Sequence, residues 1–226
     1  MEGLLYLLAF IIPLIAQIYV SATYKKNSKK DNAFGLTGYD VARKILDKNE
    51  LNDLYVVETK GTMTDHYDPT RKTVKLSTDV YHGKSVASLA IAAHECGHAI
   101  QDKEGYLFLR IRSFIYPIIN LGTRLAYIIL LLGLILEYMD LIMVGIVLVG
   151  LGLVFQIITL PVEINASKRA AKEIDQANLG NKKDQAGVKE MLTSAALTYL
   201  AGVLSSALYV FKAYTIDTVP IKEITT

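Results

Sequence analysis

The sequence contains a single cysteine, Cys96, among its 226 residues. No internal disulfide can therefore form, and no metal site can be built on a Cys-x-x-Cys pair. A lone cysteine is compatible with a reducing compartment. Histidine is also scarce, since only four are present, at positions 66, 82, 94 and 98. Any metal site in this chain must therefore be assembled from few residues.

An excess of charge of one sign is also lacking, with 24 Lys and Arg against 22 Asp and Glu. No basic stripe is interleaved with aromatic residues, which excludes a nucleic-acid-binding surface. Hydrophobic residues make up 52% of the chain and the mean hydropathy is +0.32, values that are high for a soluble domain. Because 20% of the residues are charged, the composition predicts several membrane segments together with a sizeable part in water.

The first apolar run covers residues 4–20 and is long enough to cross a bilayer as a helix. We expect it to be an uncleaved transmembrane anchor. The alternative is a cleavable signal peptide, because Val20-Ser21-Ala22 loosely resembles a cleavage site. The anchor is favoured because no Lys or Arg precedes the run, whereas Lys25, Lys26, Lys29 and Lys30 follow it and oppose translocation.

Two further apolar runs, at 114–136 and 141–162, are separated only by a polar break at 137–140. They predict two transmembrane helices joined as a hairpin. A fourth run at 191–210 is rich in Ala, Ser and Gly, small residues that suit close packing between membrane helices. It predicts a fourth span, and a buried helix of the water-facing part is the alternative.

The basic residues are distributed unevenly along the chain. Fifteen of the 24 Lys and Arg lie at 24–112 and six more at 163–190, whereas the break at 137–140 has none. By the positive-inside rule, both basic segments face the cytoplasm. We therefore expect an integral protein of a bacterial-type inner (plasma) membrane, with its N-terminus outside.

Between the first two apolar runs the chain is polar, which predicts a water-facing region. Helical spacing at 40–48 and an Ala-rich stretch at 85–101 predict two helices. Residues 54–57 and 73–76 predict two short strands, which we expect to pair as a β-hairpin across a long polar connection.

The second of these helices carries the sequence His94-Glu95-Cys96-Gly97-His98. The two histidines are four residues apart, so both imidazoles project from one helix face toward one ion. Glu95 is next to the first histidine and is placed to act as a general base in peptide hydrolysis. Gly97 leaves room beside the site, and Cys96 is expected to pack rather than to bind metal. An Ala-rich helix with two solvated histidines is the alternative.

A catalytic zinc site takes three protein ligands and keeps an open fourth position. Glu163 is the strongest candidate for the third ligand, because it closes the third apolar run. Three basic residues follow it within ten positions and place it at the cytoplasmic face, where the two histidines are also expected. His66 and His82 are the alternatives for this ligand.

The chain resembles the YugP-like membrane zinc metallopeptidases in the stretches Thr64–Pro69, Leu76–Gln101, Leu160–Ser167 and Ala195–Tyr199. This family is in turn similar to the HtpX-type membrane gluzincins, whose third ligand is a Glu followed four residues later by an Asp. Glu163 matches that ligand, whereas Ser167 stands at the position of the Asp. A hydrogen bond from this position to the site therefore does not simply carry over.

The motif and the resemblance together predict fold class and function. We expect a mainly α, multi-span helical membrane protein with a cytoplasmic zincin-like metallopeptidase domain that contains a small β-hairpin or sheet. The expected function is Zn²⁺-dependent endopeptidase activity on membrane-associated or misfolded proteins at the cytoplasmic face. The expected partners are a polypeptide substrate and the lipid bilayer, while oligomeric or partner-protein assembly stays open. The expected segments are an anchor at 1–22, the zincin-like segment at 23–112, a transmembrane hairpin at 113–162, a cytoplasmic helix with the third ligand at 163–190, a fourth span at 191–211 and a tail at 212–226.

Four further residues are candidates to support the site: Asp65, His66, Tyr67 and His82. They are placed to donate to a developing oxyanion or to orient a ligand histidine. A hydrogen-bonded turn is the alternative for the first three. The alternative function is a catalytically silent membrane scaffold or partner-binding protein with a structural zinc. The intact Glu95 argues against it, because a structural site needs no base.

Overall fold

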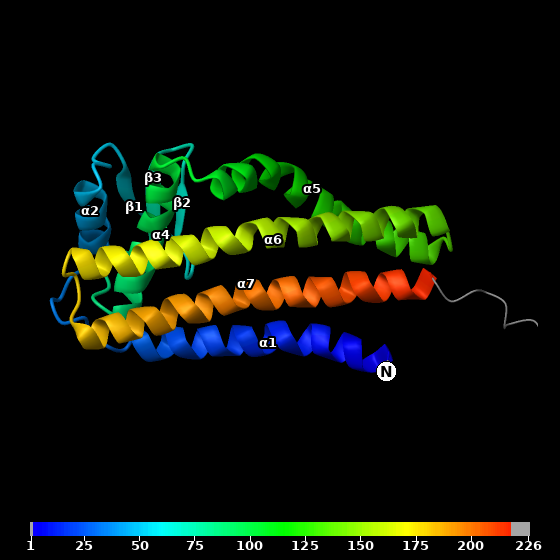
Figure 1. Ribbon diagram of the computed structural model, residues 1–226, viewed down its shortest axis with the longest axis horizontal. Coiled ribbons are helices and arrows are strands. Elements are labelled where there is room, and N and C mark those ends of the chain that lie inside the picture. The colour runs from blue at the N-terminus through cyan, green and yellow to red at the C-terminus, as the bar shows by residue number, and fades with distance from the viewer. Residues whose placement is uncertain (1, 218–226) are drawn as a thin grey trace, which may run out of the picture.

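The computed structural model describes residues 2–217, which form a mainly α structure (Figure 1). The described residues contain seven helices and one small sheet of three strands. In chain order the elements are α1 (Glu2–Asn27), α2 (Gly38–Lys48), β1 (Tyr55–Thr59), β2 (His66–Asp68), β3 (Thr73–Ser77), α3 (Thr78–Tyr81), α4 (Val86–Lys103), α5 (Leu107–Ile135), α6 (Met139–Gln176) and α7 (Lys182–Asp217).

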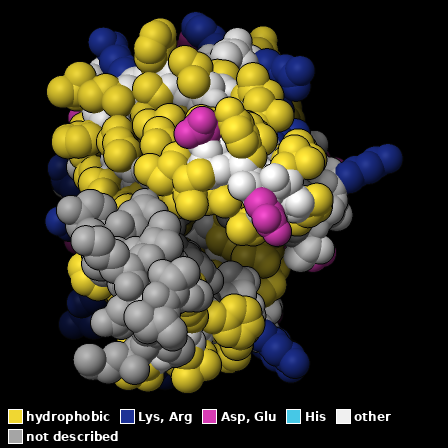
Figure 2. Space-filling model, turned by 90° about the vertical axis from the view of Figure 1, so that its right-hand side faces the viewer, with side chains coloured by type: hydrophobic (Ala, Val, Ile, Leu, Met, Phe, Trp, Pro, Cys, Tyr) yellow, Lys and Arg dark blue, Asp and Glu magenta, His cyan; other side chains and the backbone are white. Residues whose placement is uncertain are grey.

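Four helices are long and apolar enough to cross a membrane: α1, α5, α6 and α7. Each contains one of the four apolar runs found in the sequence. Figure 1 shows α1, α7 and α6 side by side along the molecule, with α5 joined to α6 at the end away from α2. Figure 2 shows that this end is mainly hydrophobic where its residues are described. Apolar side chains can stay exposed along such helices because lipid, unlike water, does not exclude them.

The helices of the spans extend beyond the apolar runs. α5 begins at Leu107, so Arg112 lies in the same helix as the second span. A cytoplasmic helix is predicted at 163–190, and in the structure this stretch is shared between the end of α6 and the start of α7. The chain turns at 177–181 between α6 and α7, with Asn178 at a φ of 49°, a left-handed conformation that Asn tolerates. In the expected tail, α7 continues to Asp217, and 218–226 lie outside the described residues.

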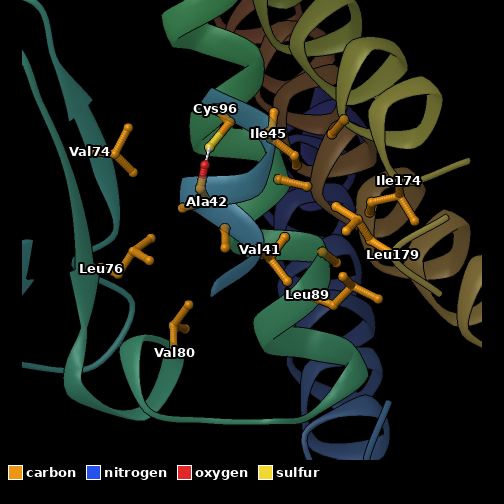
Figure 3. Close-up of a cluster of buried hydrophobic side chains, with 14 of the residues drawn as sticks. Val41, Ala42, Ile45, Val74, Leu76, Val80, Leu89, Cys96, Ile174 and Leu179 are labelled. Atoms are coloured by element: carbon orange, nitrogen blue, oxygen red, sulfur yellow. Dashed lines mark hydrogen bonds between the residues drawn. The ribbon is translucent and has the colours of Figure 1, made fainter. Parts of the chain in front are cut away.

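A hydrophobic core lies at the end of the molecule that holds α2, the sheet and α4 (Figure 3). Ile45 on α2, Leu76 on β3 and Leu89 on α4 are fully buried in it. Cys96 is buried in the same core, as the sequence predicts, and its thiol donates to the carbonyl oxygen of Ala42 at 3.6 Å. This core fixes the orientation of α4, the helix that carries the histidines.

The two predicted helices of this region are confirmed, and each begins at a side-chain cap. The hydroxyl of Thr37 accepts a hydrogen bond from the Asp40 amide, while the Asp40 carboxylate accepts one from the Thr37 amide, a capping box at the start of α2. The Ser85 hydroxyl accepts from the Ser88 amide at 3.0 Å and caps α4.

The strands form one mixed sheet in the order β1-β3-β2. β1 runs parallel to β3, whereas β2 runs antiparallel to it. The predicted hairpin between 54–57 and 73–76 is therefore wrong. The physical reason is the short strand His66–Asp68, which the tight turn after it folds back onto β3 as its antiparallel neighbour. β1 is left to pair along the other edge of β3.

Candidate metal centre

Three side chains from two helices converge at one point: His94 and His98 from α4, and Glu163 from α6. His94 Nε2 lies 3.2 Å and His98 Nε2 lies 3.5 Å from the same atom, Glu163 Oε2. One possible ligand atom from each residue lies within 4.8 Å of the other two. Helices α4 and α6 therefore bring together two imidazoles and a carboxylate that are distant in the chain, since Glu163 follows His94 by 69 residues and His98 by 65.

The two helices approach closely because Gly97 faces α6. A Cβ atom at Gly97 would lie 2.5 Å from the carbonyl oxygen of Ala166, too close for two non-bonded atoms. The sequence indicates that this glycine leaves room beside the site, and in the structure the backbone of α6 occupies that room. Gly97 thus sets the distance between the histidines and Glu163.

The second nitrogen of His98 is held by a buried glutamine. His98 Nδ1 lies 3.0 Å from Gln101 Oε1, and because an amide oxygen only accepts, Nδ1 carries the proton. His98 Nε2 is then free to act as a ligand. The Gln101 amide nitrogen donates to Val162 O at 2.8 Å and to Asn165 Oδ1 at 2.9 Å. Gln101 therefore orients His98 and ties α4 to α6.

The second nitrogen of His94 faces Ser167 on α6. His94 Nδ1 lies 3.3 Å from Ser167 Oγ. The Ser167 hydroxyl therefore reaches the site. A hydroxyl accepts from Nδ1–H as a carboxylate does, but without a negative charge. The contact of Ser167 with His94 is therefore one between neutral groups.

Glu163 is only 2% exposed, and a buried carboxylate needs a partner. Arg112 from α5 supplies one, since its Nη1 lies 2.9 Å from Glu163 Oε1. The two oxygens of this carboxylate therefore face different groups: Oε2 faces the histidines, and Oε1 faces the arginine.

Glu95 lies in the same cavity as His94 and is 8% exposed. Burial raises the pKa of the Glu95 carboxyl to about 7. The nearby charges of Glu163 and Asp65 contribute to the rise, whereas His94 and a backbone hydrogen bond from Tyr67 oppose it. Glu95 is thus a buried carboxyl group beside the convergent side chains.

The centre opens on a cavity of about 620 Å³. One part of its wall is β2 with its flanking residues, 65–70, and another part comes from α5, between Leu109 and Pro117. α7 contributes Tyr199. Cavities of this size commonly hold small ligands or a few residues of a peptide.

Two of the predicted supporting residues line this cavity but also hold structure together. Asp65 Oδ1 accepts from the backbone amide of Ser77 at 2.7 Å, at the junction of β3 and α3. The hydroxyl of Tyr67 donates to Asp102 Oδ2 on α4 at 2.9 Å. Burial and this contact raise the pKa of Tyr67, which stays a donor. These contacts fix β2 beside the metal centre.

The two remaining histidines differ in position. His66 is exposed and lines the cavity, with its Nδ1 2.8 Å from Thr64 O. His82 does not line the cavity, and its Nε2 lies 3.4 Å from Glu58 Oε2. Within the described residues, neither joins the group of possible ligands, so the third member of that group is Glu163.

The donor set fits a zinc ion. Two imidazoles and one carboxylate are the protein ligands of many catalytic zinc sites, which keep one position open to substrate and water. The second nitrogen of each histidine has a partner, as is usual for metal-binding histidines. The cavity supplies the open side.

Comparison with known proteins agrees with this geometry. Residues 3–217 match the family described as "Putative neutral zinc metallopeptidase". This chain belongs to that family. It is 44% identical, over 191 residues, to the "Putative membrane protease YugP" of Bacillus subtilis (strain 168), a match that covers 84% of this chain and 85% of that protein. No solved structure matches the chain.

The sequence analysis missed three residues of this zinc metallopeptidase centre: Gln101, Arg112 and Tyr199. Gln101 lies three positions after His98, so helical spacing could have placed it on the same face. Arg112 counts in the sequence as one more cytoplasmic charge, and no spacing relates it to Glu163. Tyr199 lies in the stretch 195–199 that resembles the family, but that resemblance does not indicate a position at the site.

Proposed function

We propose that this chain is a membrane-embedded, zinc-dependent endopeptidase that cleaves membrane-associated or misfolded proteins at the cytoplasmic face. The observation that carries the proposal is the convergence of His94, His98 and Glu163 beside a carboxylate, Glu95, in one cavity. A wall of that cavity is α5, a candidate membrane span. Substrates held at the bilayer surface would therefore meet the site directly.

In the proposed reaction, His94, His98 and Glu163 hold the metal and Glu95 moves the proton. A bound zinc ion would supply Lewis acidity toward water and the peptide carbonyl. Glu95 takes the proton of the attacking water and then passes it to the leaving amine. Its position next to His94 on α4 keeps it beside the ligands through both transfers.

We further propose that an extended substrate adds to the sheet along β2. Within residues 2–217, β3 is the one strand that pairs with β2, so β2 is an edge of the sheet, and it forms one wall of the cavity. Main-chain hydrogen bonds to such an edge bind peptides without demanding a particular sequence. We also propose that the His66 side chain, which lines the cavity, donates to the developing oxyanion. His66→Ala is then expected to lower turnover while the zinc content stays at the wild-type level, and unchanged turnover would leave this segment a structural turn.

The decisive experiment compares wild type with Glu95→Gln for cleavage of an unfolded, membrane-anchored reporter in proteoliposomes. We expect Glu95→Gln to bind zinc as the wild type does and to lose cleavage, because the amide cannot accept the proton. Glu50→Gln, a change of the same kind at an exposed position, is the control and should cleave normally. Equal cleavage by Glu95→Gln would refute the proposed role.

The orientation rests on the basic segments at 24–112 and 163–190 and has its own test. A cysteine introduced at exposed Tyr138, between α5 and α6, should react with a membrane-impermeant maleimide added outside intact cells. A cysteine at Lys182 should react only after the membrane is opened. Cys96 is buried and gives little background. The reverse labelling pattern would show that the protein has the opposite orientation in the membrane.

A further inference from the structure

The two carboxylate oxygens of Glu163 have different neighbours. Oε2 is 3.2 Å from His94 Nε2 and 3.5 Å from His98 Nε2, the atoms that would share a metal ion with it. Oε1 is 2.9 Å from Arg112 Nη1. The carboxylate is thus divided between a metal side and an arginine side.

Arg112 is well suited to hold that division in place. Among the described residues that line the cavity, it is the one Lys or Arg. The Glu163 side chain is 3% exposed and the Arg112 side chain is 30% exposed, so the carboxylate is removed from water while the guanidinium keeps some contact with it. Water therefore screens this pair less than a pair with both partners on the surface. A guanidinium is a rigid fork of donors, which fixes the direction of a carboxylate oxygen better than the mobile ammonium of lysine.

A carboxylate can bind a metal through one oxygen or through both. Binding through both would take up coordination that a catalytic zinc site leaves for water or substrate. An arginine on Oε1 opposes this, because the oxygen would have to leave its hydrogen bond, and the guanidinium charge repels a cation on that side.

We propose that Arg112 is a positioning residue that keeps Glu163 a one-oxygen ligand and so keeps the remaining metal position open. The inference rests on the proposed zinc-dependent function. It also gives α5 a role beyond that of a candidate span. Arg112, near the start of α5, would set the orientation in which Glu163 on α6 faces the two histidines on α4.

The test uses the full chain in detergent with Co²⁺ in place of zinc. Four-coordinate Co²⁺ absorbs visible light more strongly than five-coordinate Co²⁺, so absorption reports how Glu163 binds, whether or not a peptide is cleaved. Wild type is compared with Arg112→Gln and with Arg110→Gln. Arg110 lies on the same helix two residues earlier, does not line the cavity and loses the same charge when changed.

We expect Arg112→Gln to bind one metal ion per chain but to show weaker visible absorption, as Glu163 closes onto the metal with both oxygens. The weaker absorption is that of a five-coordinate metal, in which the second Glu163 oxygen binds beside the water. With zinc, kcat should fall at least tenfold while KM changes little, because that oxygen takes the place that the substrate carbonyl would use on the metal, whereas the substrate wall is unchanged. Arg110→Gln should match the wild type in both measurements. Arg112→Lys is a second variant for the case that Arg112→Gln does not fold, because it keeps a positive charge beside Glu163. It should show the same spectral change to a smaller extent.

An Arg112→Gln spectrum identical to that of wild type overturns the proposal, even if cleavage falls, because Arg112 would then act on the substrate. Loss of metal from Arg112→Gln also overturns it, because Arg112 would then be needed for binding itself. A wild type that binds no Co²⁺ removes the proposed metal site together with this inference. A wild type that binds Co²⁺ but cleaves nothing refutes only the peptidase proposal, since the spectra still decide the role of Arg112.

Discussion

The two ends of this molecule treat the same kind of side chain in opposite ways. At the end with α2, α4 and the sheet, Ile45, Leu76 and Leu89 are fully buried. On the candidate spans, Phe114 is 78% exposed and Ile135 is 67% exposed. Burial in the first region is the ordinary hydrophobic effect in water, whereas exposure in the second suits a lipid solvent. One end of the chain therefore has a core of the kind found in water-soluble domains, whereas the candidate spans have surfaces suited to lipid.

The metal centre lies where these two regions meet. α4, packed in the hydrophobic core beside α2 and the sheet, provides two candidate ligands, and α6, a candidate span that continues past the apolar run, provides the third. Gln101 and Gly97 on α4 both contact α6. The affinity of the site for metal should therefore depend on how closely α4 and α6 are packed together.

The largest effect is expected from Glu163→Ala, which removes the one candidate ligand, among the described residues, that comes from a candidate span. Zinc per chain should fall from about one to near zero after dialysis, a loss larger than the roughly 10–100-fold that partners of a ligand contribute. The measurement is metal content of the detergent-purified protein. Glu137→Ala, at the exposed far end of the same helix pair, should keep its zinc. Zinc retained in Glu163→Ala would mean that α4 binds it without α6.

The next largest effect should come from forcing the regions apart with Gly97→Ala. The new Cβ would lie 2.5 Å from Ala166 O, so α4 and α6 must separate, at a cost of about 1–3 kcal/mol in the free energy of unfolding. Zinc affinity should fall as well, because the histidines move away from Glu163. Thermal unfolding in detergent and zinc titration measure the two effects.

Gly150→Ala is the matched control, since no atom lies within 4 Å of a Cβ built at that position in α6. It should leave zinc affinity unchanged and should not destabilise the helix, because alanine favours helix more than glycine does. If both variants behaved alike, the close approach at Gly97 would have no importance for the site.

A smaller effect is expected from Gln101→Leu, which keeps the ligands and removes the partner of one of them. His98 loses the acceptor for Nδ1–H, and Val162 O and Asn165 lose a donor. Zinc affinity should fall roughly 10–100-fold, as is typical when an outer partner of a metal-binding histidine is removed. Competition with a chelating dye measures it. An unchanged affinity would show that packing alone orients His98.

The sequence predicts local features of both regions much better than the contacts between α4, α5 and α6 at the metal centre. The four apolar runs, the Ser85-capped helix and the pair of histidines follow from local composition and spacing, and the structure contains each of them. The parallel pairing of β1 with β3 does not follow, because a strand of only three residues, His66–Asp68, decides it. Arg112 and Glu163 meet across two helices, and no local pattern records such a contact.

The smallest effect should come from Ser167→Ala, which sharpens the contrast between the two ligand histidines. Ser167 Oγ is 3.3 Å from His94 Nδ1, longer than the 3.0 Å contact of Gln101 with His98, and it makes fewer further hydrogen bonds. We expect a loss in zinc affinity of about threefold, below the roughly 10–100-fold range of stronger partners. Ser167→Asp should restore or exceed wild-type affinity, because a carboxylate accepts from Nδ1–H more strongly than a hydroxyl. Ser167→Ala could instead lower zinc affinity as much as Gln101→Leu does. The serine contact would then be as important as the buried glutamine, and both histidines would depend equally on hydrogen bonds between α4 and α6.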